Sequence, residues 1–122
     1  MELDQRVADV AEQGRALLAA LREKVASLNL TGEEVVIPEF DAAQFTLEHD
    51  LYNGKQTLMG SFYPSKHYRA GFLLFHSDGS CFAEYHIMQL HPNRPKWFVE
   101  AVEAWVRDGE IMTDIRLVAM PQ

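Results

Sequence analysis

The stretch YRAGFLLFHSDGSCFAEYHIMQL, residues 68–90, decides the fold. Two apolar runs flank Ser77-Asp78-Gly79-Ser80, whose Asp-Gly pair is typical of a tight hairpin turn. We therefore predict a β-hairpin. Large apolar side chains occupy both faces of its strands, whereas an antiparallel sheet with one solvated face carries them on the other face only. Both faces of this hairpin consequently need cover, either from the same chain or from a partner.

A two-residue Asp78-Gly79 loop would pair His76 with Cys81, and this register fixes which side chains share a face. The face that we assign to the core consists of Ala70, Phe72, Leu74, Ala83, Tyr85 and Ile87. The opposite face carries the polar residues Arg69, Glu84 and His86 and an apolar group formed by Leu73, Phe75, Phe82 and Met88. We expect this apolar group to be a contact surface.

The first 28 residues are expected to form one helix, because apolar residues recur at spacings of three and four from Leu3 to Leu28. Such a helix is about 40 Å long, whereas a six-residue strand spans only about 20 Å. It would overhang the sheet unless it bends near Gly14. We expect the overhang to need cover as well.

Three further segments complete the expected fold. Asn53-Gly54 predicts a hairpin that pairs Leu47 with Gly60, and its apolar face holds Phe45, Leu47, Leu51, Leu58 and Phe62. A second helix is predicted from Pro95 to the stop signal Gly109, with an apolar stripe of Trp97, Phe98, Ala101, Val102, Trp105 and Val106. Residues 111–120 alternate as a last strand.

These segments predict a single α+β domain over residues 1–122. Its antiparallel sheet has about five strands, from two consecutive hairpins and a C-terminal strand, and it carries a long N-terminal helix and a second helix. The element order is α-β-β-β-β-α-β. We expect the last strand to pair antiparallel with the first; a parallel pairing with the fourth is the alternative.

Charge and composition limit the partners of the chain. The net charge of −7, from 11 basic and 18 acidic residues, argues against nucleic-acid binding. No apolar run approaches the ~20 residues of a membrane span, and the first residues lack the pattern of a secretory signal. Cys81 is the only cysteine, so an internal disulfide is impossible. We expect a soluble cytoplasmic protein that does not bind membranes.

Acidic residues are concentrated in one segment of the chain. No Lys or Arg occurs between Lys24 and Lys55, and residues 33–50 hold Glu33, Glu34, Glu39, Asp41, Glu48 and Asp50. Such a segment can attract a basic partner.

Catalytic, metal and cofactor signatures are absent from the sequence. The five histidines do not have the spacing of a zinc site, and no Gly-rich phosphate loop is present. The best candidate ligand site is the set Arg69, Gly71, Glu84 and His86. In the predicted register Gly71 lies opposite His86, so the missing side chain would leave a small pocket beside an imidazole and a carboxylate.

The sequence leaves three functions open. A non-enzymatic protein–protein interaction module, acting as a homodimer through Leu73, Phe75, Phe82 and Met88, accounts best for the second apolar face and for the long helix. The first alternative is a small-molecule-binding protein or enzyme that uses Arg69, Glu84 and His86. The second is an immunity- or chaperone-like partner of a basic protein, bound through residues 33–50.

Overall fold

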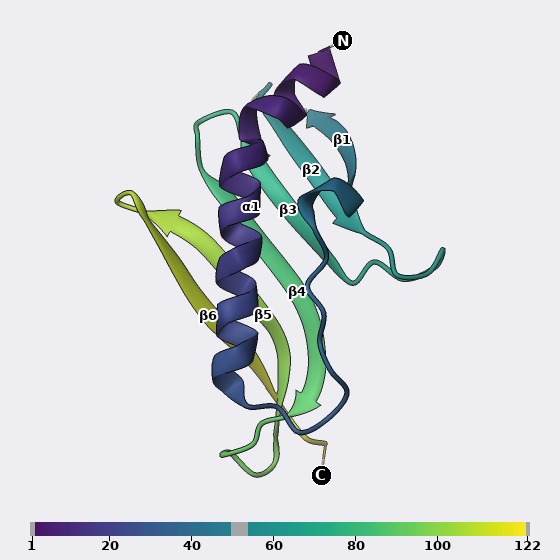
Figure 1. Cartoon of the computed structure of the whole chain (residues 1–122), viewed down its shortest axis with the longest axis vertical. Helices are drawn as coiled ribbons and strands as arrows, with labels where there is room; N and C mark the ends of the chain where they lie inside the picture. Colours follow the sequence, from purple (N-terminus) through teal and green to yellow (C-terminus); the bar gives the residue numbers. More distant parts are fainter. Residues whose placement is uncertain (1, 50–53, 122) are drawn as a thin grey trace.

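A helix and a single sheet make up the computed structural model, which describes residues 2–49 and 54–121. Helix α1 (Glu2–Leu28) and a short 3-10 turn, η1 (Phe40–Ala42), precede the strands. The strands are β1 (Gln44–His49), β2 (Gln56–Phe62), β3 (Gly71–His76), β4 (Cys81–Leu90), β5 (Trp97–Arg107) and β6 (Glu110–Ala119). They form one antiparallel sheet in the order β1-β2-β3-β4-β5-β6, and α1 lies across one of its faces (Figure 1). The α+β class is therefore confirmed.

Helix α1 confirms the predicted N-terminal helix. Its inner stripe is fully buried at Leu17, Leu18 and Leu21. The expected overhang is small, because β4, β5 and β6 have 10, 11 and 10 residues and so span roughly 33–36 Å, close to the length of the helix. Only the N-terminal end of α1 rises above the strand ends (Figure 1). A β-carbon at Gly14 would overlap the ring of Phe40, so this glycine allows η1 to approach the helix.

The predicted second helix is wrong, because residues 97–107 form strand β5. A β-bulge between Val99 and Ala101 shifts the alternation by one residue. The apolar residues before and after the bulge then fall on the α1 side of the sheet, where Val99, Val102 and Ala104 are fully buried. The spacing that resembles a helical stripe is thus an interrupted strand pattern rich in β-branched and aromatic residues. The described residues consequently hold six strands instead of about five.

The C-terminal strand is confirmed as β6, but its neighbour differs from both predicted alternatives. β6 pairs antiparallel with β5, with Arg107 opposite Glu110. Asp108 and Gly109 both have positive φ, 52° and 79°, as the two central residues of a type I′ hairpin turn require. Gly109 therefore belongs to a hairpin turn and not to a helix end.

The hairpin of β3 and β4 has a register one residue away from the predicted one. Its loop has three residues and ends with Gly79 at φ 93°. The His76 N–H donates to Ser80 O at 2.9 Å, and Phe75 pairs with Cys81. A one-residue slip moves every side chain of one strand to the other face. Here it places Leu73 and Phe75 of β3 under α1, and the face assignment of β3 is corrected accordingly.

The other face assignments are confirmed. Ala83, Tyr85 and Ile87 of β4 point toward α1 and belong to or pack on the core. In the first hairpin Leu47 pairs with Leu58 instead of Gly60. This shift of two residues leaves each side chain on its predicted face, and the core includes Phe45, Leu47, Leu58 and Phe62. Leu51 and Asn53 of the predicted turn lie outside the described residues.

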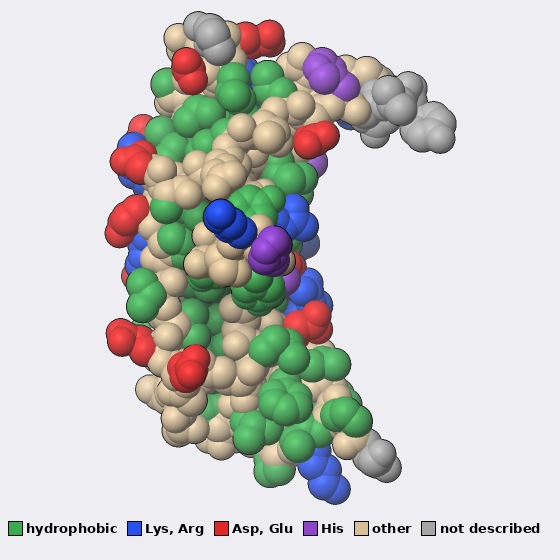
Figure 2. Space-filling view, turned by 90° about the vertical axis from the view of Figure 1, so that its right-hand side faces the viewer, with side chains coloured by type: hydrophobic (Ala, Val, Ile, Leu, Met, Phe, Trp, Pro, Cys, Tyr) green, Lys and Arg blue, Asp and Glu red, His purple; other side chains and the backbone are tan. Residues whose placement is uncertain are grey.

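The sheet has one face packed on α1 and one face without a covering layer in the described part of the chain (Figure 1). We call the second face the open face. In profile the molecule is hollowed on that side, which is the right-hand side of Figure 2. Within the described ranges no helix is both long and apolar enough to span a membrane.

Candidate binding face

The open face carries a continuous row of large apolar side chains, which we call the apolar row. Each member is the direct cross-strand neighbour of the next, from β2 to β6. The members are Met59, Leu74, Phe82, Trp105 and Met112. All five remain partly exposed. With strands about 4.8 Å apart, the row runs for about 19 Å across the sheet.

Aromatic contacts widen the apolar row on the β3 side. The ring of Phe72 lies 5.9 Å from that of Phe82, in a tilted arrangement. The guanidinium of Arg69 lies 5.2 Å from the centre of the Phe72 ring. Such stacking leaves the charge of Arg69 exposed while its stem covers apolar surface.

A second apolar group, the lower patch, lies nearer the far ends of β4, β5 and β6. Leu90 pairs with Phe98, and Phe98 pairs with Val118. Leu90 is 53 % exposed and Val118 is 37 % exposed. Met88 adjoins this group at the β4 bulge, where its φ is 51°. Hydrophobic side chains accordingly gather at the lower end of the hollowed side in Figure 2.

A charged network lies between the apolar row and the lower patch. The Arg116 Nη1 group donates to Glu84 Oε1 at 2.6 Å and to Glu103 Oε1 at 2.8 Å. The Nη2 group of Arg116 lies 3.5 Å from Glu100, and Nε2 of His86 lies 3.3 Å from Glu84 Oε2. One guanidinium thus holds three carboxylates drawn from β4 and β5.

Burial and ion pairing shift the pKa values of two members of this network, Glu103 and Arg116. The Glu84 side chain is only 7 % exposed, so its carboxylate depends on Arg116 for compensation. Desolvation raises the pKa of Glu103, and the charge of Arg116 opposes that shift. The hydrogen bond with Glu84 raises the pKa of Arg116, which therefore stays charged. The network carries excess negative charge that a cationic partner group can neutralise.

The structure brings together only two of the four residues of the predicted ligand site. Glu84 and His86 are in contact, and Nδ1 of His86 lies 3.4 Å from the hydroxyl of Tyr68. Gly71 pairs with Tyr85 instead of His86 and faces α1, where a β-carbon would overlap Tyr85. Arg69 stacks on Phe72. The four residues therefore do not line one pocket.

Sequence reasoning missed Arg116, the residue that organises the network. The alternation of the last strand places it on the same face as Met112 and Asp114, which is correct. The contact of Arg116 with Glu103 is not predicted, because the sequence pattern predicts a helix over residues 97–107. A strand pattern with one bulge in that segment is the signal that would have placed the two side chains together.

The four residues predicted as a contact surface divide between the two faces of the sheet. Leu73 and Phe75 are 0 % and 2 % exposed beneath α1, so they are part of the core. Phe82 belongs to the apolar row, and Met88 is 55 % exposed beside the lower patch. The open face thus keeps Phe82 and Met88 and replaces the other two by Phe72 and Leu74.

The acidic segment is partly neutralised by α1. Asp41 lies 3.7 Å from Arg15, and Glu39 lies 3.4 Å from Arg22. The hydroxyl of Thr46 donates to Glu48 at 3.3 Å. Asp50 lies outside the described residues. The described residues 33–49 are therefore not a continuous surface of free carboxylates.

The open face offers an apolar centre together with charged groups, the combination found in protein–protein interfaces. Comparisons of this chain with protein-family models, with curated proteins and with solved structures found no match.

Proposed function

We propose that the protein is a non-enzymatic interaction module that forms a homodimer through its open face. The observation that carries this proposal is the apolar row, which crosses five strands and remains partly exposed. Contiguous apolar patches of a few hundred Å² on a monomer mark contact sites. Two such sheet faces can pack about 10 Å apart with interdigitating side chains.

The size of the open face suits a second copy. Six strands at about 4.8 Å spacing, with the longer ones spanning about 33 Å, give a face of roughly 800 Å². Stable protein interfaces bury about 800 Å² on each partner. The area of the open face is therefore in the range that a homodimer contact needs.

Charge favours a two-fold arrangement of the two copies. Arg69 has no carboxylate within ion-pair distance in the described ranges, whereas the network around Arg116 carries excess carboxylates. A two-fold axis that is parallel to the strands and passes between β3 and β4 would place β3 of one copy over β4 of the other. Arg69 then faces Glu84 and His86 of the second copy, and the same contact occurs twice.

In this proposal Glu84 and His86 act in recognition and not in catalysis. The carboxylate of Glu84 is already engaged by Arg116 at 2.6 Å. A general base needs to reach a substrate proton in a shaped site. Gly71, the residue expected to open a pocket beside them, faces α1 instead.

Sedimentation equilibrium over roughly 1 µM to 1 mM, the range of weak to moderate affinities, tests the homodimer. We expect a monomer–dimer equilibrium, and we expect Trp105→Ser to weaken association at least tenfold, because central aromatic residues dominate interface energy. The matched control is Val36→Ser, which removes an apolar side chain that is 68 % exposed and lies outside the sheet.

Folding of the variants is checked by circular dichroism. Arg69→Glu is a second test that leaves the sheet interior untouched, and it should weaken the dimer with a reduced salt dependence. A strict monomer at the highest concentration overturns the proposal. A dimer that survives both Trp105→Ser and Arg69→Glu unchanged overturns the assignment to the open face.

A further inference from the structure

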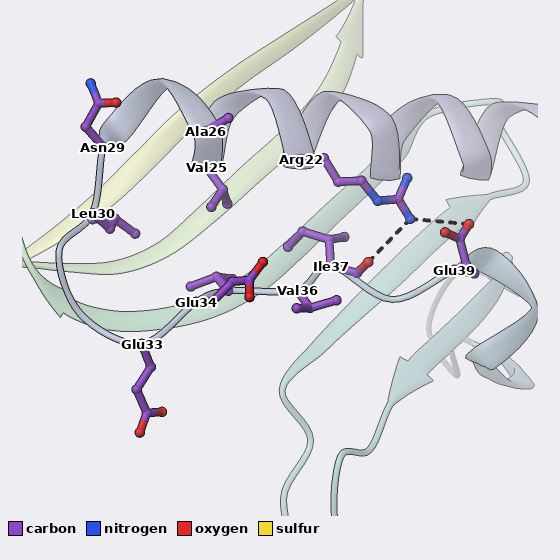
Figure 3. Close-up of a pocket in the computed structure, with 11 residues that line it drawn as sticks. Arg22, Val25, Ala26, Asn29, Leu30, Glu33, Glu34, Val36, Ile37 and Glu39 are labelled. Atoms are coloured by element: carbon purple, nitrogen blue, oxygen red, sulfur yellow. Dashed lines mark hydrogen bonds and ion pairs between the residues drawn. The ribbon is translucent and has the colours of Figure 1, made fainter.

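A cavity of about 500 Å³ lies between the C-terminal end of α1 and residues 30–39, on the α1 side of the sheet and away from the open face (Figure 3). Its volume falls in the range of small-molecule sites, roughly 300–1,000 Å³. Apolar side chains form much of its wall, namely Val25, Ala26, Leu30, Val35 and Ile37. In Figure 3 Val25 points from the helix into the space between α1 and the facing segment.

Two adjacent glutamates differ in their relation to this cavity. The carboxylate of Glu34 lies on the side of the segment that faces α1, below Val25, whereas Glu33 points away from the helix (Figure 3). Within the described part of the chain Glu34 has no ion-pair partner. The one cation of the wall, Arg22, is engaged by the carbonyl of Pro38 at 2.9 Å and by Glu39 at 3.4 Å. The carboxylate of Glu34 is therefore available to a ligand.

The helix adds to the negative potential of the cavity. α1 ends at Leu28 beside the cavity, and its last turn contains no basic residue. The C-terminal end of a helix carries roughly half a negative charge on its free carbonyl groups. No Lys or Arg occurs in residues 25–54. The end of α1 and Glu34 both border the cavity and both favour a cation there.

We propose that this cavity binds a small organic cation with an apolar body, such as a primary alkylammonium ion. The alkyl chain would lie against Val25, Leu30 and Ile37, and the ammonium group would bind the carboxylate of Glu34 and the carbonyl groups at the end of α1. An apolar wall does not compensate a small metal ion for the hydration that it would lose in the cavity. The cavity should therefore select against inorganic cations. This site is separate from the open face and does not depend on dimerisation.

The test uses n-hexylammonium as the probe, with n-hexanol as a neutral control of the same chain length. Titration followed by ¹H–¹⁵N spectra should shift the amide signals of Val25, Leu30 and Ile37 and leave the open face unchanged. Glu34→Gln should weaken binding about fivefold, the effect of one partly exposed ion pair. Glu33→Gln removes the same charge one residue away and should leave the affinity within about twofold, because long-range surface charges are screened.

Each other outcome counts against the proposal. Absence of shifts at millimolar n-hexylammonium, or shifts that map outside the cavity, overturns the site. Equal affinity for n-hexanol overturns the selection for cations. An equal loss of affinity for n-hexylammonium in Glu33→Gln and Glu34→Gln overturns the role of Glu34 and indicates a diffuse electrostatic attraction instead.

Discussion

The guanidinium of Arg116 on β6 lies 2.6 Å from the carboxylate of Glu84 on β4 and reaches it across the intervening strand β5. On the way the same Nη1 atom lies 2.8 Å from Glu103 of β5. Three strands are therefore joined by one cation on the open face. Because Glu84 is almost fully buried, this contact is the main electrostatic compensation for its carboxylate.

Arg116→Met should lower the free energy of unfolding by about 2 kcal/mol, since it leaves the Glu84 carboxylate buried without its cation. The value lies below that of fully buried pairs because the Arg116 side chain is 41 % exposed. Urea unfolding at neutral pH measures the change. Arg107→Met, an exposed arginine of the same hairpin, should change stability by less than about 0.5 kcal/mol.

A double variant separates the missing contact from general damage to β6. Glu84→Gln in the Arg116→Met background removes the uncompensated charge, so it should restore part of the lost stability. If the double variant is as unstable as the sum of the two single variants, Glu84 and Arg116 are not coupled.

The pH dependence of stability should reveal the raised pKa of Glu103. Burial raises its pKa above the ordinary value of 4.5, so the folded chain binds this proton more tightly than the unfolded chain. The resulting stabilisation is fully present below pH 4.5 and is lost as the pH rises through the folded-state pKa. Glu103→Gln carries no such proton. The stability of the unchanged protein relative to Glu103→Gln should therefore increase from neutral pH toward pH 4.5. Parallel stability curves for the two proteins would contradict this expectation.

The sequence predicts those elements whose periodicity is unbroken. Helix α1 keeps its apolar stripe from Leu3 to Leu28, and β6 contains no inserted residue from Ile111 to Ala119. The first hairpin keeps its predicted faces even though its register differs by two residues, because the period of a strand is two. Regular patterns thus fix the type of an element and the face of each side chain.

Single-residue irregularities defeat the same reasoning. The β3–β4 loop has three residues instead of the predicted two, and this places each side chain of β3 on the face opposite to the predicted one. The bulge after Val99 gives the sequence of β5 the spacing of a helical stripe. Neither the three-residue loop nor the β-bulge leaves a recognisable mark in the amino-acid composition of its segment. These two irregularities also explain why the sequence does not predict the charged network, because Glu103 and Arg116 are neighbours only when residues 97–107 form a strand. Face assignments that cross a bulge or a loop therefore need the structure.

The loop glycine of the β3–β4 hairpin should be sensitive to substitution. Gly79 has φ 93°, a conformation that L-residues adopt only with strain. Gly79→Ala should lower stability by about 1 kcal/mol in urea unfolding. Ser77→Ala in the same exposed loop should have little effect, since it requires no change of φ. Equal stability of Gly79→Ala and the unchanged protein would show that the loop tolerates another conformation.

Gly14 should likewise resist replacement, although alanine is the better helix former by about 1 kcal/mol. A β-carbon at position 14 would overlap the ring of Phe40, which is only 3 % exposed and has little room to move. We expect Gly14→Ala to cost about 1–3 kcal/mol in urea unfolding, the usual range for overpacking. Phe40→Leu makes space at the same contact, so Gly14→Ala should be less harmful, or even stabilising, in the Phe40→Leu background. Additive effects of the two substitutions would show that the close approach of η1 to α1 does not determine the need for glycine.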